Sequence, residues 1–254
     1  MNPLTIALIA FGCIFGGMVL GMFLRSVLPE HHLSADSKDV LKLGIGILGT
    51  LAALVIGLLI ASAKGSFDTM NTGLNQSGSK IILLDRLMAH YGPETREIRD
   101  LLRRNIASVI EQVWAKKRMS QTETKATASK ARIETVQDKL LQLAPQNDAQ
   151  RWLRSRALEV TGEIAETRWL LFQQVGLSAL PMPFLVLLVS WLVIIFFALG
   201  LVSPRNATVI AVLLLCALSS TGALYLILEL DRPYGGLIQI SSAPLRNALA
   251  YLGQ

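Results

Sequence analysis

The chain has 254 residues, of which 52% are apolar and only 17% charged, whereas an ordinary soluble domain is about 45–50% apolar and about 25% charged. Most of the charge is concentrated in residues 64–178, which carry 18 of the 24 Lys and Arg residues and 13 of the 18 Asp and Glu residues. This distribution excludes a simple soluble globule, a disordered chain and a disulfide-rich secreted domain. The charge-poor remainder predicts helices that lie in a membrane.

Four uncharged stretches are long enough to cross a bilayer, which takes roughly 20 apolar residues in a helix. We expect the first span to be retained as an anchor, because no Lys or Arg precedes it as a signal peptide would require. Pro181 and Pro183 predict the start of the third span, since proline is tolerated in the first turn of a helix. The spans are expected near residues 4–27, 43–63, 182–202 and 207–229.

An even number of spans places both termini on one side of the membrane. The segment 64–178 has a net charge of +5 and begins with Lys64 at the membrane boundary. The positive-inside tendency therefore places this segment and both termini in the cytoplasm. The predicted fold is an all-α membrane protein with a helical cytoplasmic region between spans two and three. Its expected parts are a transmembrane hairpin over 1–63, the cytoplasmic helices over 64–178, and a second hairpin with a cytoplasmic tail over 179–254.

The middle segment shows helical rather than strand periodicity. After Gly92-Pro93, a helix-start signal, apolar residues recur every three or four positions along the Ile98–Val113 face. Residues 119–131 lack an apolar stripe, which indicates a linker or a frayed helix. A short amphipathic helix then ends at Ala144-Pro145, and a longer one continues toward Arg168.

Groups that could support catalysis are scarce in this sequence. Histidine occurs only at His31, His32 and His90, and no zinc-protease helix, nucleophile elbow or phosphate loop is present. The His31-His32 pair, close to Glu30 and Asp36, could hold a metal ion, but an exposed polar loop is the simpler interpretation. The charges of the middle segment are mixed in sign, which is typical of a solvated face and not of a nucleic-acid groove. We therefore expect no catalytic residues, no metal, no cofactor and no nucleic-acid partner.

Small and polar residues of the second span recur at steps of three or four. At 100° per residue, nine of them fall within about 80° of one another on a helical wheel. One interpretation is a pore-facing stripe that is narrow in the membrane and polar at its cytoplasmic mouth; the other is close helix packing, which the same spacing permits. The membrane part comprises Gly46, Thr50, Ala53, Gly57 and Ala61, and the mouth comprises Lys64 with, if the helix continues, Asp68, Asn71 and Asn75. The first span has similar small residues at Gly12, Gly16, Gly17 and Gly21.

A turn is predicted directly after the fourth span. Pro233 and the pair Gly235-Gly236 favour a change of direction at the membrane surface, where Asp231 can accept hydrogen bonds from backbone groups. The stretch Ile238–Leu245 is then expected to pack as a short apolar element. We interpret this run as a structural turn and not as a ligand site.

These residues also carry a family resemblance. The chain resembles the bestrophin-like domain family of bacterial membrane proteins, in three places that together span roughly residues 45–250. In this family basic residues commonly follow the Phe67-Asp68 pair, whereas Thr69-Met70-Asn71 follow here, so the charge at the cytoplasmic mouth differs. The matching places are Gly57-Leu58-Leu59 through Phe67-Asp68; Leu101-Leu102-Arg103 onward to Trp114, then Arg168 and the approach to Pro181; and Leu230 to Gly236 with Ser241 to Leu245.

The resemblance implies a four-span protein similar to bestrophin channels, which assemble as rings, typically pentamers, around a pore lined by the second span. It thus implies an oligomeric ion channel in the bacterial inner membrane. Its partners would be the lipid bilayer, further copies of the chain (a pentamer, with a tetramer as the alternative) and permeating inorganic ions. No acidic cluster like the calcium clasp of animal bestrophins is present, so calcium gating is not expected. The alternative function is a membrane-anchored scaffold whose cytoplasmic helices bind a partner through the Ile98–Val113 face, without conduction.

Overall fold

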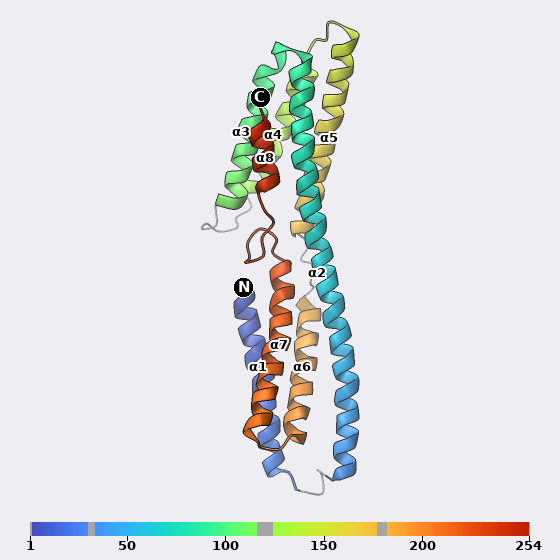
Figure 1. Ribbon diagram of the computed structural model, residues 1–254, viewed down its shortest axis with the longest axis vertical. Helices are drawn as coiled ribbons and strands as arrows, with labels where there is room; N and C mark the ends of the chain where they lie inside the picture. The colour runs from blue at the N-terminus through green and yellow to red at the C-terminus, as the bar shows by residue number, and fades with distance from the viewer. Residues whose placement is uncertain (1, 30–33, 116–123, 177–181, 254) are drawn as a thin grey trace. The chain divides into compact units, whose positions relative to one another are not determined.

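The chain is all-helical in a computed structural model that describes residues 2–29, 34–115, 124–176 and 182–253 (Figure 1). No strand occurs within these ranges, so the predicted fold class is confirmed. Two short irregular turns flank α3: the 3₁₀ turn η2 (Pro93–Thr95) and the π-helical turn η3 (Glu111–Ala115). The α-helices are α1 (Pro3–Val27), α2 (Ala35–Tyr91), α3 (Arg96–Ile110), α4 (Thr124–Leu141), α5 (Asp148–Gly176), α6 (Met182–Val202), α7 (Ala207–Leu230) and α8 (Ala243–Tyr251).

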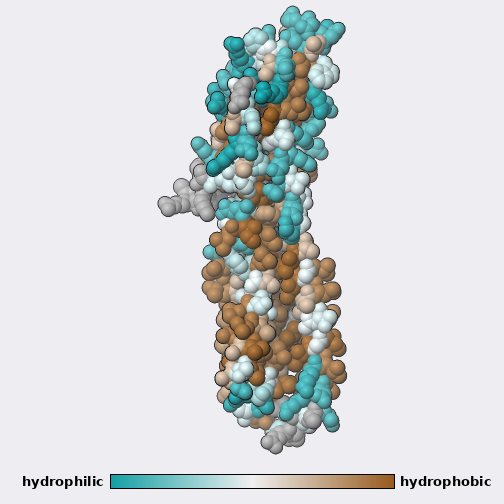
Figure 2. Space-filling view, in the orientation of Figure 1, coloured by the Kyte–Doolittle hydropathy of each residue, from teal (hydrophilic) through white to brown (hydrophobic). Residues whose placement is uncertain are grey.

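Four of the described helices, α1, α2, α6 and α7, are long and apolar enough to cross a membrane. The ends of α6 coincide with the predicted third span, and α7 begins at the expected residue. Pro204 separates these two helices, and the Asn206 side chain accepts a hydrogen bond from the Thr208 backbone N–H to cap α7. Figure 2 shows apolar side chains covering the visible face of the unit that these helices form.

The second span is part of a much longer helix than the predicted 43–63. Helix α2 has 57 residues and continues without interruption from Ala35 to Tyr91. Asp68, Asn71 and Asn75 therefore lie on the same helix as the membrane part of the stripe. It ends where Gly92 adopts a φ of 139°, a conformation that favours glycine, and where Pro93 has no N–H to continue the helix. The helix start predicted after Gly92-Pro93 is confirmed, since η2 begins at Pro93 and α3 follows at Arg96.

The structure changes one helix boundary of the middle segment. Residues 124–131 are helical and form the start of α4, so the linker interpretation is wrong for them. The run Thr124-Lys125-Ala126-Thr127-Ala128 lacks an apolar stripe but contains alanine and lysine, which favour helix without any packing. Residues 119–123 lie outside the described residues.

The contacts divide the chain into two compact units. The first contains Met1–Ser66 and Ser178–Arg232, and the second contains Phe67–Leu177 and Pro233–Gln254. In the first unit α1 packs closely on α6, because a Cβ added at Gly21 would overlap the Phe197 carbonyl oxygen and one added at Gly200 would overlap the Met18 carbonyl oxygen. Gly17 and Gly21 of the first span thus serve close helix packing, whereas a Cβ added at Gly12 or Gly16 would meet no atom within 4 Å.

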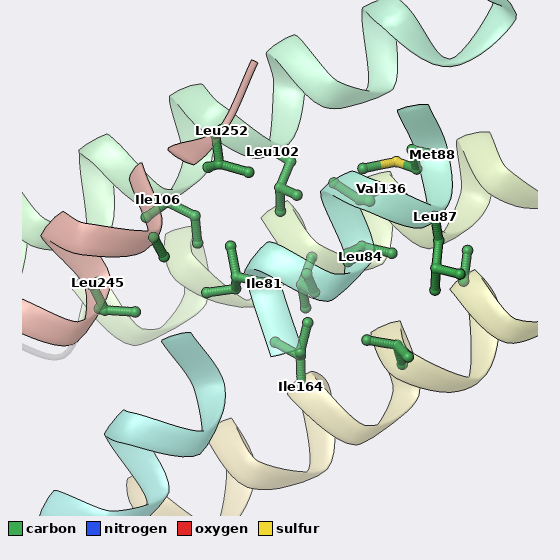
Figure 3. Packing of buried hydrophobic residues seen from close by; sticks show 14 of the residues in the cluster. Ile81, Leu84, Leu87, Met88, Leu102, Ile106, Val136, Ile164, Leu245 and Leu252 are labelled. Atoms are coloured by element: carbon green, nitrogen blue, oxygen red, sulfur yellow. The ribbon is translucent and has the colours of Figure 1, made fainter. Parts of the chain in front are cut away.

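The second unit has its own apolar core. Figure 3 shows Ile81 and Leu84 of α2 packed with Leu102 of α3 and Val136 of α4. Helix α8 closes this core with Leu245 and Ala248, together with Leu252 directly after the helix, all of them buried. The C-terminal residues after α7 therefore pack with the middle segment of the chain.

Candidate functional site

One face of the membrane part of α2 is buried within the first unit. Ala52 and Ala63 on this face are only 2% and 1% exposed. Ala52 belongs to a core formed with residues of α1, α6 and α7, and Val55, Ile56 and Leu59 pack against that core. Once this face is known, the helical period gives the direction in which the other faces of α2 point.

The predicted stripe lies on a face of α2 that its own chain leaves uncovered. Gly46, Thr50, Ala53, Gly57 and Ala61 are all exposed, as is Lys64 at the end of the stripe's membrane part. The Thr50 hydroxyl donates to the Gly46 carbonyl oxygen at 2.9 Å, which satisfies its proton within the helix and leaves the hydroxyl oxygen able to accept. The stripe is therefore narrow, weakly polar and open to whatever lies beside the chain.

Glycines with the same spacing have different surroundings in α1 and α2. A Cβ added at Gly46 or Gly57 would meet no atom within 4 Å, whereas one added at Gly17 would meet Val193 at 3.1 Å. Close packing within the chain thus explains Gly17 and Gly21 of α1, whereas Gly12 and Gly16 of that helix and the glycines of the stripe on α2 have no such contact.

A second exposed column runs beside the stripe. Leu51, Leu54 and Leu58 are 44%, 61% and 63% exposed, and the helical period places them about 60–120° from the centre of the stripe. The exposed half of α2 therefore presents a column of small side chains next to a column of leucines.

The part of α2 that belongs to the second unit carries the remaining mouth residues. Asp68 and Asn75 are exposed and Asn71 is half-buried. The Asn75 side-chain NH2 group donates to the Asn71 backbone carbonyl oxygen at 2.9 Å. The side-chain carbonyl oxygen of Asn75 is left to interact outside the helix. An open groove between α2 and α5 is lined by Asp68, Thr69, Thr72, Gly73, Gln76, Thr167, Leu170 and Leu171.

The predicted turn after α7 is present and is tied to the second unit. The Ile240 backbone N–H donates to the Pro233 carbonyl oxygen at 2.9 Å, and the Trp114 indole N–H donates to the Ile240 carbonyl oxygen at 2.9 Å. The Trp114 and Tyr234 rings also meet edge-on, with their centroids 5.8 Å apart. Burial raises the pKa of the Tyr234 hydroxyl.

Proline and packing shape this turn more than glycine does. Among the described residues only Gly92 and Gly253 have a positive φ, so neither Gly235 nor Gly236 uses the conformational freedom of glycine. Asp231 terminates α7, and its backbone N–H donates to the Ile227 carbonyl oxygen.

Sequence reasoning did not find a buried ion pair in the second unit. Asp85 is 1% exposed, and its two carboxylate oxygens accept hydrogen bonds from the Arg99 guanidinium at 2.7 and 2.8 Å. The Gly253 backbone N–H approaches the same carboxylate at 3.4 Å. The available signal was a single acidic residue on the otherwise apolar face of α2 that carries Ile81, Leu84 and Met88.

The two other sites considered from the sequence have different outcomes. Most of the Ile98–Val113 face is not available to a partner, because Ile98, Leu102, Ile106 and Ile110 are buried in the chain's own core. His31 and His32 lie outside the described residues. Within the part that is described, no three His, Cys, Asp or Glu residues come together as a metal site would require.

Comparisons with known proteins show which family and which solved structures this architecture is similar to. A family model of the Bestrophin-like domain matches residues 12–245. A bacterial bestrophin homologue from Klebsiella pneumoniae, solved by zinc-based phasing, is similar with a TM-score of 0.65 at 15% identity over 95% of this chain and 99% of that chain. A tryptophan-to-alanine variant of that homologue is similar with a TM-score of 0.72 at 14% identity over 100% and 99%. At this level of identity the likeness establishes a shared fold. No curated protein matches the chain.

Proposed function

The chain belongs to the bestrophin-like domain family, and on this premise we propose that it is an oligomeric ion channel that conducts ions passively through a pore lined by α2. The observation that carries the proposal is the uncovered stripe on α2, whose glycines have no packing role within the chain. The bacterial inner membrane is the proposed location, with both termini and residues 64–178 in the cytoplasm.

A pore of this kind requires several copies of the chain. Four membrane helices in one subunit do not enclose a hydrated path, so the α2 helices of neighbouring subunits would surround it in a ring with closed symmetry. A pentamer is the proposed assembly, with a tetramer as the alternative. In such a ring the small column of α2 faces the pore, and the leucine column lies against the neighbouring subunit.

The composition of the stripe suggests how ions would be controlled. Its membrane part has no charge between Gly46 and Ala61, so the narrow section would gate by losing its water, as hydrophobic constrictions do. Lys64, Asp68, Asn71 and Asn75 would then act on ions at the cytoplasmic mouth, where Lys64 favours anions and Asp68 favours cations.

Cysteine substitution along α2 tests this arrangement. The two native cysteines, Cys13 and Cys216, are exposed and must first be replaced to give a silent background. In that background we expect a charged thiol reagent to reduce ion flux through reconstituted Thr50→Cys and Gly57→Cys channels. Flux assays in vesicles before and after the reagent provide the measurement.

The matched controls are Leu54→Cys and Leu58→Cys, which lie on the adjacent exposed column of the same helix. We expect the reagent to leave flux through them largely unchanged. Undiminished flux through labelled Thr50→Cys and Gly57→Cys channels would overturn the pore-lining role of the stripe. If only the leucine variants are blocked, the leucine column faces the pore instead.

A further inference from the structure

Two arginines tie together the ends of α1 and α6 in the first unit. Arg25, in the last turn of α1, donates through Nη1 to the Val202 carbonyl oxygen of α6 at 3.1 Å. Arg205, which follows α6, donates through Nη2 to the Met22 carbonyl oxygen of α1 at 2.9 Å. Arg25 thus covers the last carbonyl group of α6, where the helix dipole favours a cation, and Arg205 binds a carbonyl group in the C-terminal part of α1.

This exchange places both guanidinium groups against the same two helix ends. Met22 and Arg25 are one helical turn apart, and Val202 and Arg205 are likewise three residues apart. A guanidinium has five N–H donors, and the helix carbonyls account for one nitrogen of each. Within the described residues no carboxylate forms an ion pair with either arginine. Two neighbouring cations with donors to spare form a site suited to an anion.

The position of the pair indicates which anions can reach it. α1 ends at Val27 and α6 at Val202, and Figure 1 shows the end of α1 and the α6–α7 turn at the same end of the first unit. Large apolar side chains of these helix ends, Phe23 and Val27, are 62% and 64% exposed, as expected for residues that face lipid. The arginines therefore lie where the hydrocarbon layer meets the headgroups.

We propose that Arg25 and Arg205 together bind the phosphate group of an anionic phospholipid. Guanidinium groups match phosphate oxygens in paired hydrogen bonds, and positive side chains at a membrane surface attract anionic lipids. A bound phosphate would also hold the ends of α1 and α6 together across the two hairpins. This proposal does not depend on ion conduction or on the side of the membrane on which the site lies.

The test uses the full chain in phosphatidylcholine vesicles, with or without part of the lipid replaced by phosphatidylglycerol. We expect phosphatidylglycerol to raise the unfolding temperature of the wild type and to be retained on it in native mass spectrometry. In R25Q/R205Q we expect its affinity to fall by roughly tenfold or more, because charge-assisted hydrogen bonds are lost. R25K/R205K, which keeps both charges but loses the planar fork, should be intermediate.

The control is K38Q/K42Q, which removes two positive charges from the start of α2, at the same end of the first unit, and should retain the lipid effect. The readout is the difference between the two vesicle types, so a general loss of stability from the uncapped helix ends does not imitate the expected result. Wild-type lipid affinity in R25Q/R205Q, or an equal loss in K38Q/K42Q, would overturn the proposal. A third arm adds inorganic phosphate to phosphatidylcholine vesicles: stabilisation there that matches phosphatidylglycerol would show that a free phosphate, and not a lipid, is the ligand.

Discussion

Asp85 is a charged side chain that is almost completely buried in the second unit. Its carboxylate is held by both nitrogens of the Arg99 fork, and burial makes each partner costly to leave alone. Hydrogen bonding to Asp85 raises the pKa of the Arg99 guanidinium. The ion pair connects α2 to α3 across the break at Gly92 and Pro93.

Removing this carboxylate should be strongly destabilising. We expect Asp85→Ala to lower the free energy of unfolding by about 3 kcal/mol, because breaking a buried ion pair leaves the other charge uncompensated. Thermal unfolding of the purified protein in detergent measures the change. Asp148→Ala is the matched control, since the Asp148 side chain is 93% exposed in its pair with Arg151 and should matter little. Equal effects in the two variants would contradict the structural role of Asp85.

At the scale of elements, α1 and α2 show how one sequence spacing can serve two purposes. Gly21 of α1 lies against the backbone of α6, whereas Gly57 of α2 lies against nothing in its own chain. Periodicity identifies which residues share a face, but the neighbour of that face depends on the packing of the other helices. The sequence therefore left two interpretations open for both helices, and packing separates them only for α1.

Two alanine substitutions turn this difference into a measurement. Gly21→Ala should lower the unfolding temperature, because overpacking at a tight contact typically costs about 1–3 kcal/mol. Gly57→Ala should leave it unchanged or raise it slightly, since alanine is favoured over glycine in a helix by about 1 kcal/mol. Thermal unfolding of both variants in the same detergent is the assay. If Gly57→Ala proves as damaging as Gly21→Ala, then a close contact of α2 exists between subunits, which would favour the packing interpretation of the stripe.

For the whole molecule, charge distribution was sufficient to predict the four spans, and apolar periodicity was sufficient to predict that the segment between spans two and three is helical. Burying a charge in hydrocarbon is expensive, so uncharged stretches of sufficient length have few alternatives to spanning a membrane. The length of α2 was harder to predict, because nothing in residues 64–91 forces the helix to continue. The break at Gly92 was predictable, since Pro93 cannot extend a helix.

The contacts between distant segments were not predictable from one sequence. Trp114 donates to Ile240, which is 126 positions away, and the π-helical turn that carries Trp114 has no simple sequence signature. Asp85 and Arg99 are only 14 positions apart, yet the geometry of the intervening turn decides whether they meet. The candidate stripe was identified as a face from the sequence, while its exposure required the fold.

Assembly is the prediction that belongs to the whole molecule. We expect native mass spectrometry of the purified protein to give a complex five times the 27.7 kDa mass of one chain, with four copies as the alternative. A ring is expected because only neighbouring copies can complete a path along α2. A protein that remains monomeric in lipid as well as in detergent would contradict the proposed channel.

The contact between α1 and α6 has a consequence for how the chain is made. Arg25 and its partner Val202 are separated by 177 positions, and the glycine contacts of α1 with α6 bridge nearly the same distance. At about 5–20 residues per second, roughly 9–35 s pass between the synthesis of one partner and the other. During this interval the first helix is already in the bilayer while its glycine face still lacks α6. The nascent chain must therefore be protected from pairing with a wrong helix until its own late partner emerges.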